Sequence, residues 1–192
     1  VIELEDGWCK NAGKGLTITV SPKNKRFKSY NKDLIIGKSN LQSDNFGIFY
    51  FANREIEQIE IPPFIKKINA YSLSECVYLM NVKIPNNSEL EFISDFAFKW
   101  STLTRIFIPK HVKVIGKGAF SEFTNMSKID FDQNSELQYD TIIIALRDIE
   151  HAVIPSYIKR IYPFAFAYCK QLNSIEFQEN SNLEIIDDYA FL

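Results

Sequence analysis

A short motif returns along the chain at nearly constant spacing, and a repeat of this length restricts the fold more than any other feature of the sequence. The template is LTRIFIPKHVKVIGKGAF, from Leu103 to Phe120, in which I-x-I-P precedes V-x-x-I and then Ala-Phe. The first apolar residues of the I-x-I segments are spaced by 23, 24, 23, 23 and 23 residues, at Ile59, Val82, Ile106, Ile129, Ala152 and Ile175. We therefore expect a stack of units of about 23 residues.

The units also alternate in type over a longer distance. The stretch Phe46–Phe98 and the stretch Tyr139–Phe191 lie 93 positions apart, which is the length of four units, and 19 of their 53 aligned residues are identical. This correspondence indicates that a block of four units has been duplicated.

Each unit predicts a strand followed by a turn across a core. In Ile106-Phe107-Ile108 the side chains alternate in and out, and Pro109 then ends the strand because proline has no N–H to donate. The Ala-Phe segment fits a short helical turn that buries one side. We expect Ile108, Ile115, Phe120 and Ile161 in the core and a stack of the Ala-Phe phenylalanines, namely Phe98, Phe120, Phe166 and Phe191, with Leu73 in one place. One unit alone cannot bury its apolar face, so the units form a solenoid.

The consensus I-x-I-P-x-x-V-x-x-I-G-x-x-A-F-x-x-[CF]-x-x-[LM] resembles the BspA-like, Treponema-type leucine-rich repeat, clearly from Ile56 to Leu192. The resemblance implies an α/β repeat fold: a leucine-rich-repeat solenoid with a concave parallel β-sheet and a short helical or irregular convex side. The units Phe46–Ile56 and Leu137–Ile149 depart from it because both lack Ala-Phe.

The sequence divides into two regions. Residues 1–45 are interpreted as degenerate, truncated N-terminal repeats, with Asp6-Gly7-Trp8-Cys9 in the place of the Ala-Phe segment and strands expected at Leu16–Val20 and in Asp33–Asn40. Residues 46–192 are interpreted as BspA-like repeats, the last of them truncated, so we interpret the chain as a fragment of a longer protein.

Composition excludes several classes of protein. A net charge of −2 argues against bulk electrostatic binding to nucleic acid, and no apolar run approaches the roughly 20 residues of a membrane helix. Three cysteines without a C-x-x-C motif argue against zinc and thioredoxin-type sites. Cys76 and Cys169 occupy equivalent places about four turns apart, roughly 20 Å, so we predict two buried thiols and no disulfide.

Catalytic patterns are scarce. His111 and His151 lie at non-core positions without metal ligands at suitable spacing, and Asp187 and Asp188 are adjacent residues of a turn. We therefore predict no enzyme activity, catalytic residue, metal or cofactor.

Positions between the apolar strand residues face outward and can recognise a partner. We predict a protein-binding face formed by Met80, Lys83, Arg105, Phe107, Lys128, Asp130 and Val153, which combine apolar centres with flanking charges. The alternative is that Phe107 and Val153 are ordinary exposed apolar residues. Asn86 and Asn125 begin N-x-S sequences, which are glycosylation acceptors in secreted proteins.

The resemblance implies a non-enzymatic, surface-associated or secreted adhesin-type protein that binds host-cell or extracellular-matrix proteins. Two alternatives stay open. One is a cytoplasmic scaffold or regulator, which unpaired cysteines favour. The other is a structural protein that self-associates end to end through exposed strand edges.

Overall fold

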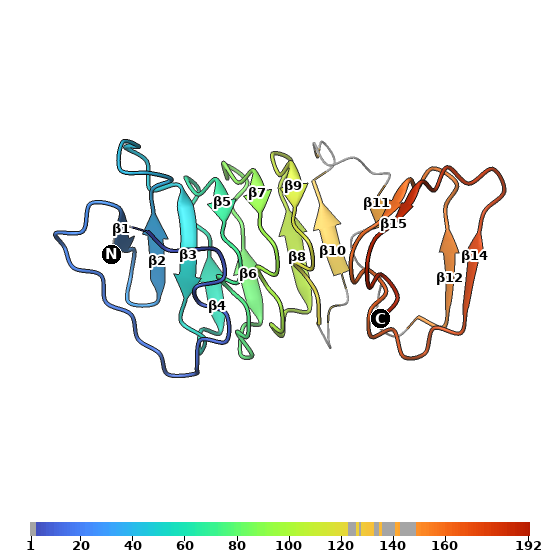
Figure 1. Cartoon of the computed structure of the whole chain (residues 1–192), viewed down its shortest axis with the longest axis horizontal. Coiled ribbons are helices and arrows are strands. Elements are labelled where there is room, and N and C mark those ends of the chain that lie inside the picture. The colour runs from blue at the N-terminus through green and yellow to red at the C-terminus, as the bar shows by residue number, and fades with distance from the viewer. Residues whose placement is uncertain (1–2, 123–125, 127, 133–134, 136–140, 143–148) are drawn as a thin grey trace.

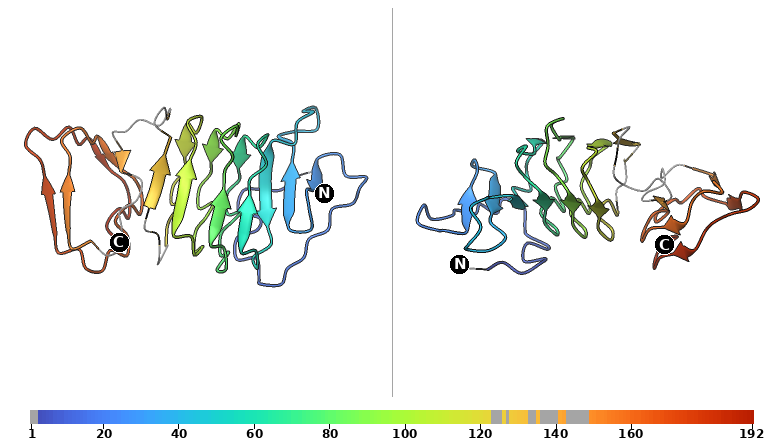
Figure 2. Two further views of the ribbon diagram at one scale, coloured as in Figure 1. Left: turned by 180° about the vertical axis from the view of Figure 1, so that it is seen from behind. Right: turned by 90° about the horizontal axis from the view of Figure 1, so that it is seen from above.

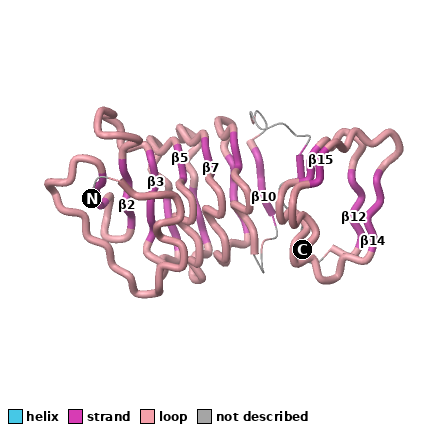
Figure 3. The backbone as a smooth tube through the Cα atoms, viewed as in Figure 1, coloured by secondary structure: helices cyan, strands magenta, loops and turns pink. Residues whose placement is uncertain are grey.

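A computed structural model describes residues 3–122, 126, 128–132, 135, 141–142 and 149–192, without the side chains of Lys128, Thr141 and Ile142. Short strands stand side by side along the long axis of the molecule (Figure 1). Strands, turns and loops make up the described residues, which contain no helix (Figure 3). None of them therefore belongs to a helix that is long and apolar enough to cross a membrane.

Two rows of strands form the walls of the solenoid, and Figure 2 shows them from behind and from above. The first row consists of the predicted I-x-I strands: β4 (Gln58–Glu60), β6 (Asn81–Lys83), β8 (Arg105–Ile108), β10 (Lys128–Phe131), β12 (His151–Ile154) and β14 (Ser174–Phe177). The second row consists of β3 (Ile48–Ala52), β5 (Lys67–Ile68), β7 (Phe92–Ile93), β9 (Val114–Ile115), β11 (Thr141–Ile142), β13 (Arg160–Ile161) and β15 (Ile185–Ile186).

The registers of the first row confirm the repeat. β4 pairs with β6, β8 with β10 and β12 with β14, all parallel, so that residues 23 positions apart lie opposite each other, as Ile59 does with Val82. Each strand alternates buried and outward-facing residues, for example eBe in β6 and eBeB in β12. The leucine-rich-repeat solenoid predicted from the sequence is therefore present.

The second row is a sheet that the sequence did not predict as one. Its strands pair in parallel through the V-x-x-I part of each unit, so that Lys67, Phe92 and Val114 lie opposite one another. These strands are only two residues long in β5, β7 and β9, which is too short for a period of two to be visible.

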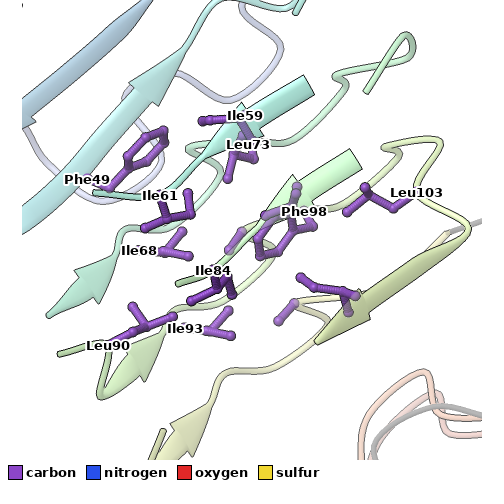
Figure 4. Packing of buried hydrophobic residues seen from close by; sticks show 14 of the residues in the cluster. Phe49, Ile59, Ile61, Ile68, Leu73, Ile84, Leu90, Ile93, Phe98 and Leu103 are labelled. Carbon is purple, nitrogen blue, oxygen red and sulfur yellow. The ribbon is translucent and has the colours of Figure 1, made fainter. Parts of the chain in front are cut away.

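The core between the rows contains the predicted residues. Ile108, Ile115, Phe120 and Ile161 are at most 3% exposed, and Figure 4 shows Phe98 packed among the aliphatic side chains of neighbouring turns. Phe98 stacks on Phe120 with ring centroids 5.4 Å apart, and Phe166 stacks on Phe191 at 5.0 Å. The predicted stack of phenylalanines is confirmed in these two pairs.

The convex side corrects one prediction, because the Ala-Phe segments form turns and no helical turn. Two residues four positions apart take positive φ angles in each segment, such as Tyr71 with Glu75 and Phe96 with Trp100. Left-handed residues end a right-handed helix, so no helix propagates here. The convex side is irregular, and with no helix in the described residues the α/β label does not hold.

The N-terminal residues pack on the second row. β1 (Phe27–Ser29) pairs antiparallel with β2 (Leu34–Gly37), and β2 pairs antiparallel with β3. The strand expected in Asp33–Asn40 is therefore present, whereas Leu16–Val20 is not a strand. That residues 1–45 are degenerate repeats stays a prediction.

Residues 5–12 nevertheless adopt the turn of a repeat. Gly7 and Asn11 have positive φ at the same spacing of four. Three backbone bonds join residues three apart, with Trp8, Lys10 and Ala12 as donors, as in the turn around Phe98. This turn lies against the first Phe46–Ile56 unit, which has no Ala-Phe segment of its own.

Arg54 attaches this turn to the stack. Its guanidinium is 1% exposed and donates to the carbonyl oxygens of Cys9 and Tyr71, both at 3.1 Å, and of Ser72 at 2.9 Å. The ring of Phe51 lies 4.8 Å from the guanidinium carbon. Arg147, its predicted counterpart, lies outside the described residues, as do Phe123 and Asn125.

Candidate protein-binding face

The outer face of the first row is hollowed over β6, β8 and β10. The hollow is open to solvent, has a volume of about 1260 Å³, and is lined by residues of the stretches 80–86, 104–107 and 130–132. Outward side chains of three adjacent turns therefore share one surface.

The structure brings most of the predicted binding residues together in this hollow. Met80, Lys83, Arg105, Phe107 and Asp130 line it, and Met80 is 65% exposed. Lys128 is in β10, but its side chain lies outside the described atoms. Val153 is 45% exposed on β12 and does not line the hollow.

The sequence also missed residues of the hollow. Asn86, Phe131 and Asp132 line it, although Phe131 occupies a repeat position that is buried in Ile84 and Ile108. Asn86 and Asp132 follow their strands directly, and only their position after the I-x-I segment signals this location.

Charged pairs join neighbouring strands across this face. Lys83 Nζ lies 3.1 Å from Glu60 Oε2, and Arg105 Nε lies 2.6 Å from Asp130 Oδ2. Farther along the row, His151 Nδ1 lies 2.6 Å from Ser174 Oγ. Both His151 and Glu176 are exposed, and exposed pairs of this kind contribute little to stability, so their charges stay available to a partner.

A seam divides the first row inside the hollow. β6 and β8 are neighbours (Figure 1), but no ladder joins them among the described residues. The preceding return is one residue short: Ile93 to Ile106 spans 13 positions, against 14 for Ile68 to Val82 and for Ile115 to Ile129. This difference shifts β8 relative to β6 and accounts for the single 24-residue spacing in the repeat.

The thiols and histidines do not form a reactive site in the part of the chain that is described. All three cysteines are buried and free, as predicted, and burial raises the pKa of Cys76 to about 11, so its thiol is protonated at neutral pH. No cluster of three metal-ligating side chains occurs among the described residues, and His111 is exposed. Asp187 accepts two bonds from Arg160, at 2.7 and 2.9 Å, and this pair raises the pKa of Arg160.

The fold is similar to that of known bacterial proteins. A leucine-rich repeat protein from Eubacterium ventriosum aligns with 97% of this chain and 55% of its own, with a TM-score of 0.66 and 21% identity. A leucine-rich cell surface protein from Faecalibacterium prausnitzii aligns with 70% of this chain and 42% of its own, with a TM-score of 0.54 and 25% identity. The chain thus spans about half the length of these proteins.

Sequence comparison gives the family. No protein of curated function matches the chain. The family model described as the BspA type leucine-rich repeat region matches residues 44–143 and 144–192, in six copies. The chain belongs to the BspA-type leucine-rich repeat family.

Proposed function

We propose that the chain is a non-enzymatic protein-recognition module of a surface-associated, adhesin-type protein that binds host-cell or extracellular-matrix proteins. The observation that carries the proposal is the hollow on the first row, where Met80 and Phe107 lie among Lys83, Arg105 and Asp130. Exposed apolar side chains ringed by charges have the composition of an interface centre.

The family and its structural relatives support the cellular location in this proposal. Leucine-rich repeats present a row of variable side chains on a rigid scaffold, which suits protein–protein interaction. The Faecalibacterium relative is a cell surface protein, and location at the cell surface or secretion is proposed here by extension.

The test combines localisation with binding. Antibodies against this chain should label intact, unpermeabilised cells that produce the full-length protein. Purified chain should bind one or more members of a panel of immobilised matrix proteins, and Phe107→Ala should weaken that binding about tenfold or more, as for an interface anchor. Phe92→Ala is the matched control, because Phe92 is a 39% exposed phenylalanine on the second row. Labelling only after permeabilisation would refute the surface location and favour the cytoplasmic scaffold, which the three free cysteines also favour.

A second candidate function is end-to-end self-assembly. Phe177, Ile185 and Ile186, on β14 and β15, are 45%, 43% and 50% exposed. Sizing the chain over a hundredfold range of concentration tests this candidate, because a monomer at every concentration excludes it.

A further inference from the structure

The seam between β6 and β8 leaves a backbone donor without a protein acceptor. In the preceding turn, Ile61 N donates to Lys83 O at 2.9 Å. The equivalent bond across the seam would run from Ile84 N to Phe107 O, but no such bond forms, and the Ile84 N–H has no other acceptor in the described chain. A buried, unpaired N–H has a free-energy cost that a ligand oxygen can relieve.

The carbonyl of Ile84 lacks its usual donor as well. In later turns of the first row the residue after the strand donates back to this position, as Asp132 N does to Ile108 O at 3.0 Å. Across the seam that residue is Pro109, which has no N–H. The seam is therefore built into the sequence by a short return and a proline.

Positive charge borders the seam on both sides. Lys83 stands on β6 and Arg105 on β8, whereas their carboxylate partners, Glu60 and Asp130, stand on the outer strands β4 and β10. The side chains of Lys83 and Arg105 are 63% and 66% exposed. The order of charges across the four strands is negative, positive, positive, negative, so the centre attracts an anion.

Apolar surface lies next to this positive centre. Met80 and Phe107 line the same hollow, one from each side of the seam. A methionine that is 65% exposed adapts to partners of different shape. An anionic group in the seam would therefore have apolar surface within one or two residues of an extended chain.

We propose that this seam binds an acidic, extended segment of the partner protein. One aspartate or glutamate carboxylate lies between Lys83 and Arg105 and accepts from the Ile84 N–H, and a neighbouring apolar side chain packs on Met80 and Phe107. Charge-assisted hydrogen bonds of this kind are about twice as strong as neutral ones. The inference rests on the proposed function and narrows its partner to acidic–apolar segments.

The experiment selects ligands without assuming a sequence. The whole chain is immobilised and used to select from a random display library of peptides of about 12 residues, which can cross several strands at roughly 4.8 Å spacing. We expect enrichment of Asp or Glu beside Phe, Leu or Ile. The dissociation constant of a selected peptide should rise about tenfold or more in Lys83→Gln/Arg105→Gln, whereas Lys113→Gln, in an ion pair with Glu91 on the second row, should leave it unchanged.

Amide exchange locates the contact. In the free chain the Ile84 amide should exchange faster than the Ile61 amide, which is bonded to Lys83 O, and the selected peptide should slow Ile84 while leaving Ile61 unchanged. Selected peptides without acidic preference, no selected peptides, or an unchanged Ile84 amide would each overturn the inference. Matrix-protein binding that still depends on Phe107 would then leave the proposed function standing, whereas loss of that dependence would remove the proposed function itself.

Discussion

Removal of the Phe98 ring tests the stacked core most directly. Phe98 is fully buried and lies face to face with Phe120, at 14° between the ring planes, and both belong to the main core cluster. Phe98→Ala removes the transfer free energy of the ring, leaves a cavity that rigid turns cannot fill, and breaks one aromatic pair. These effects together should lower the free energy of unfolding by about 3–5 kcal/mol.

Position along the stack supplies the matched controls. Phe191 occupies the same motif place but is 41% exposed, so Phe191→Ala should cost about 1–2 kcal/mol, since the loss follows the buried area. Phe98→Leu imitates Leu73, the natural variant at this place, and should cost less than about 2 kcal/mol.

Urea unfolding followed by far-ultraviolet circular dichroism and by tyrosine and tryptophan fluorescence gives the three free energies. Coincidence of the probes must be checked first, because repeat arrays lose two-state behaviour when cooperativity breaks down. A cost below about 1 kcal/mol for Phe98→Ala, or equal costs for Phe98→Ala and Phe191→Ala, would show that the ring does not carry the load assigned to it.

Three further predictions concern Arg54, Cys76 and Lys83. Arg54→Met should lower the free energy of unfolding by about 2–4 kcal/mol, because buried carbonyls lose their donor, and should expose residues 5–12 to limited proteolysis; Arg54→Lys should not restore the resistance, since one ammonium cannot replace a two-pronged fork. Burial raises the folded-state pKa of Cys76 to about 11 from 9.0, so its contribution is complete below pH 9 and is lost as pH rises towards 11; urea titrations should show a steeper loss over this window, by about 2 kcal/mol, than in Cys76→Ala. Lys83→Gln should change the free energy of unfolding by less than about 0.5 kcal/mol, measured in the same way, because its ion pair is exposed; a larger loss would mean that binding defects of Lys83 variants reflect misfolding.

The repeat made the first row predictable. A strand with buried residues at i and i+2 and a spacing of 23 residues leaves one stacking register, and Ile59, Val82, Ile106 and Ile129 lie opposite their predicted neighbours wherever a ladder forms. Outward positions follow from the same alternation, which is why five of the seven predicted binding residues line one hollow.

The helical turn was predicted wrongly because spacing alone cannot distinguish a helical turn from a tight turn with left-handed residues. Ala-Phe followed by an apolar residue three positions later fits both conformations. The deciding residues, such as Tyr71 and Phe96, are not glycine, and aromatic residues rarely take positive φ, so composition gave no signal.

The N-terminal turn shows a different limit of the sequence. The unit Phe46–Ile56 has no Ala-Phe segment, and residues 5–12, some 40 positions earlier, pack there instead, with Cys9 Sγ 3.9 Å from Tyr50 O across 41 positions. A period search aligns each segment with its chain neighbours, so it cannot detect a turn supplied from elsewhere. The detectable sign was chemical: an arginine, Arg54, stands where a solenoid core begins, and a buried guanidinium requires several carbonyl acceptors that its own unit does not offer. An isolated arginine at an apolar repeat position therefore predicts that a second segment packs against that unit.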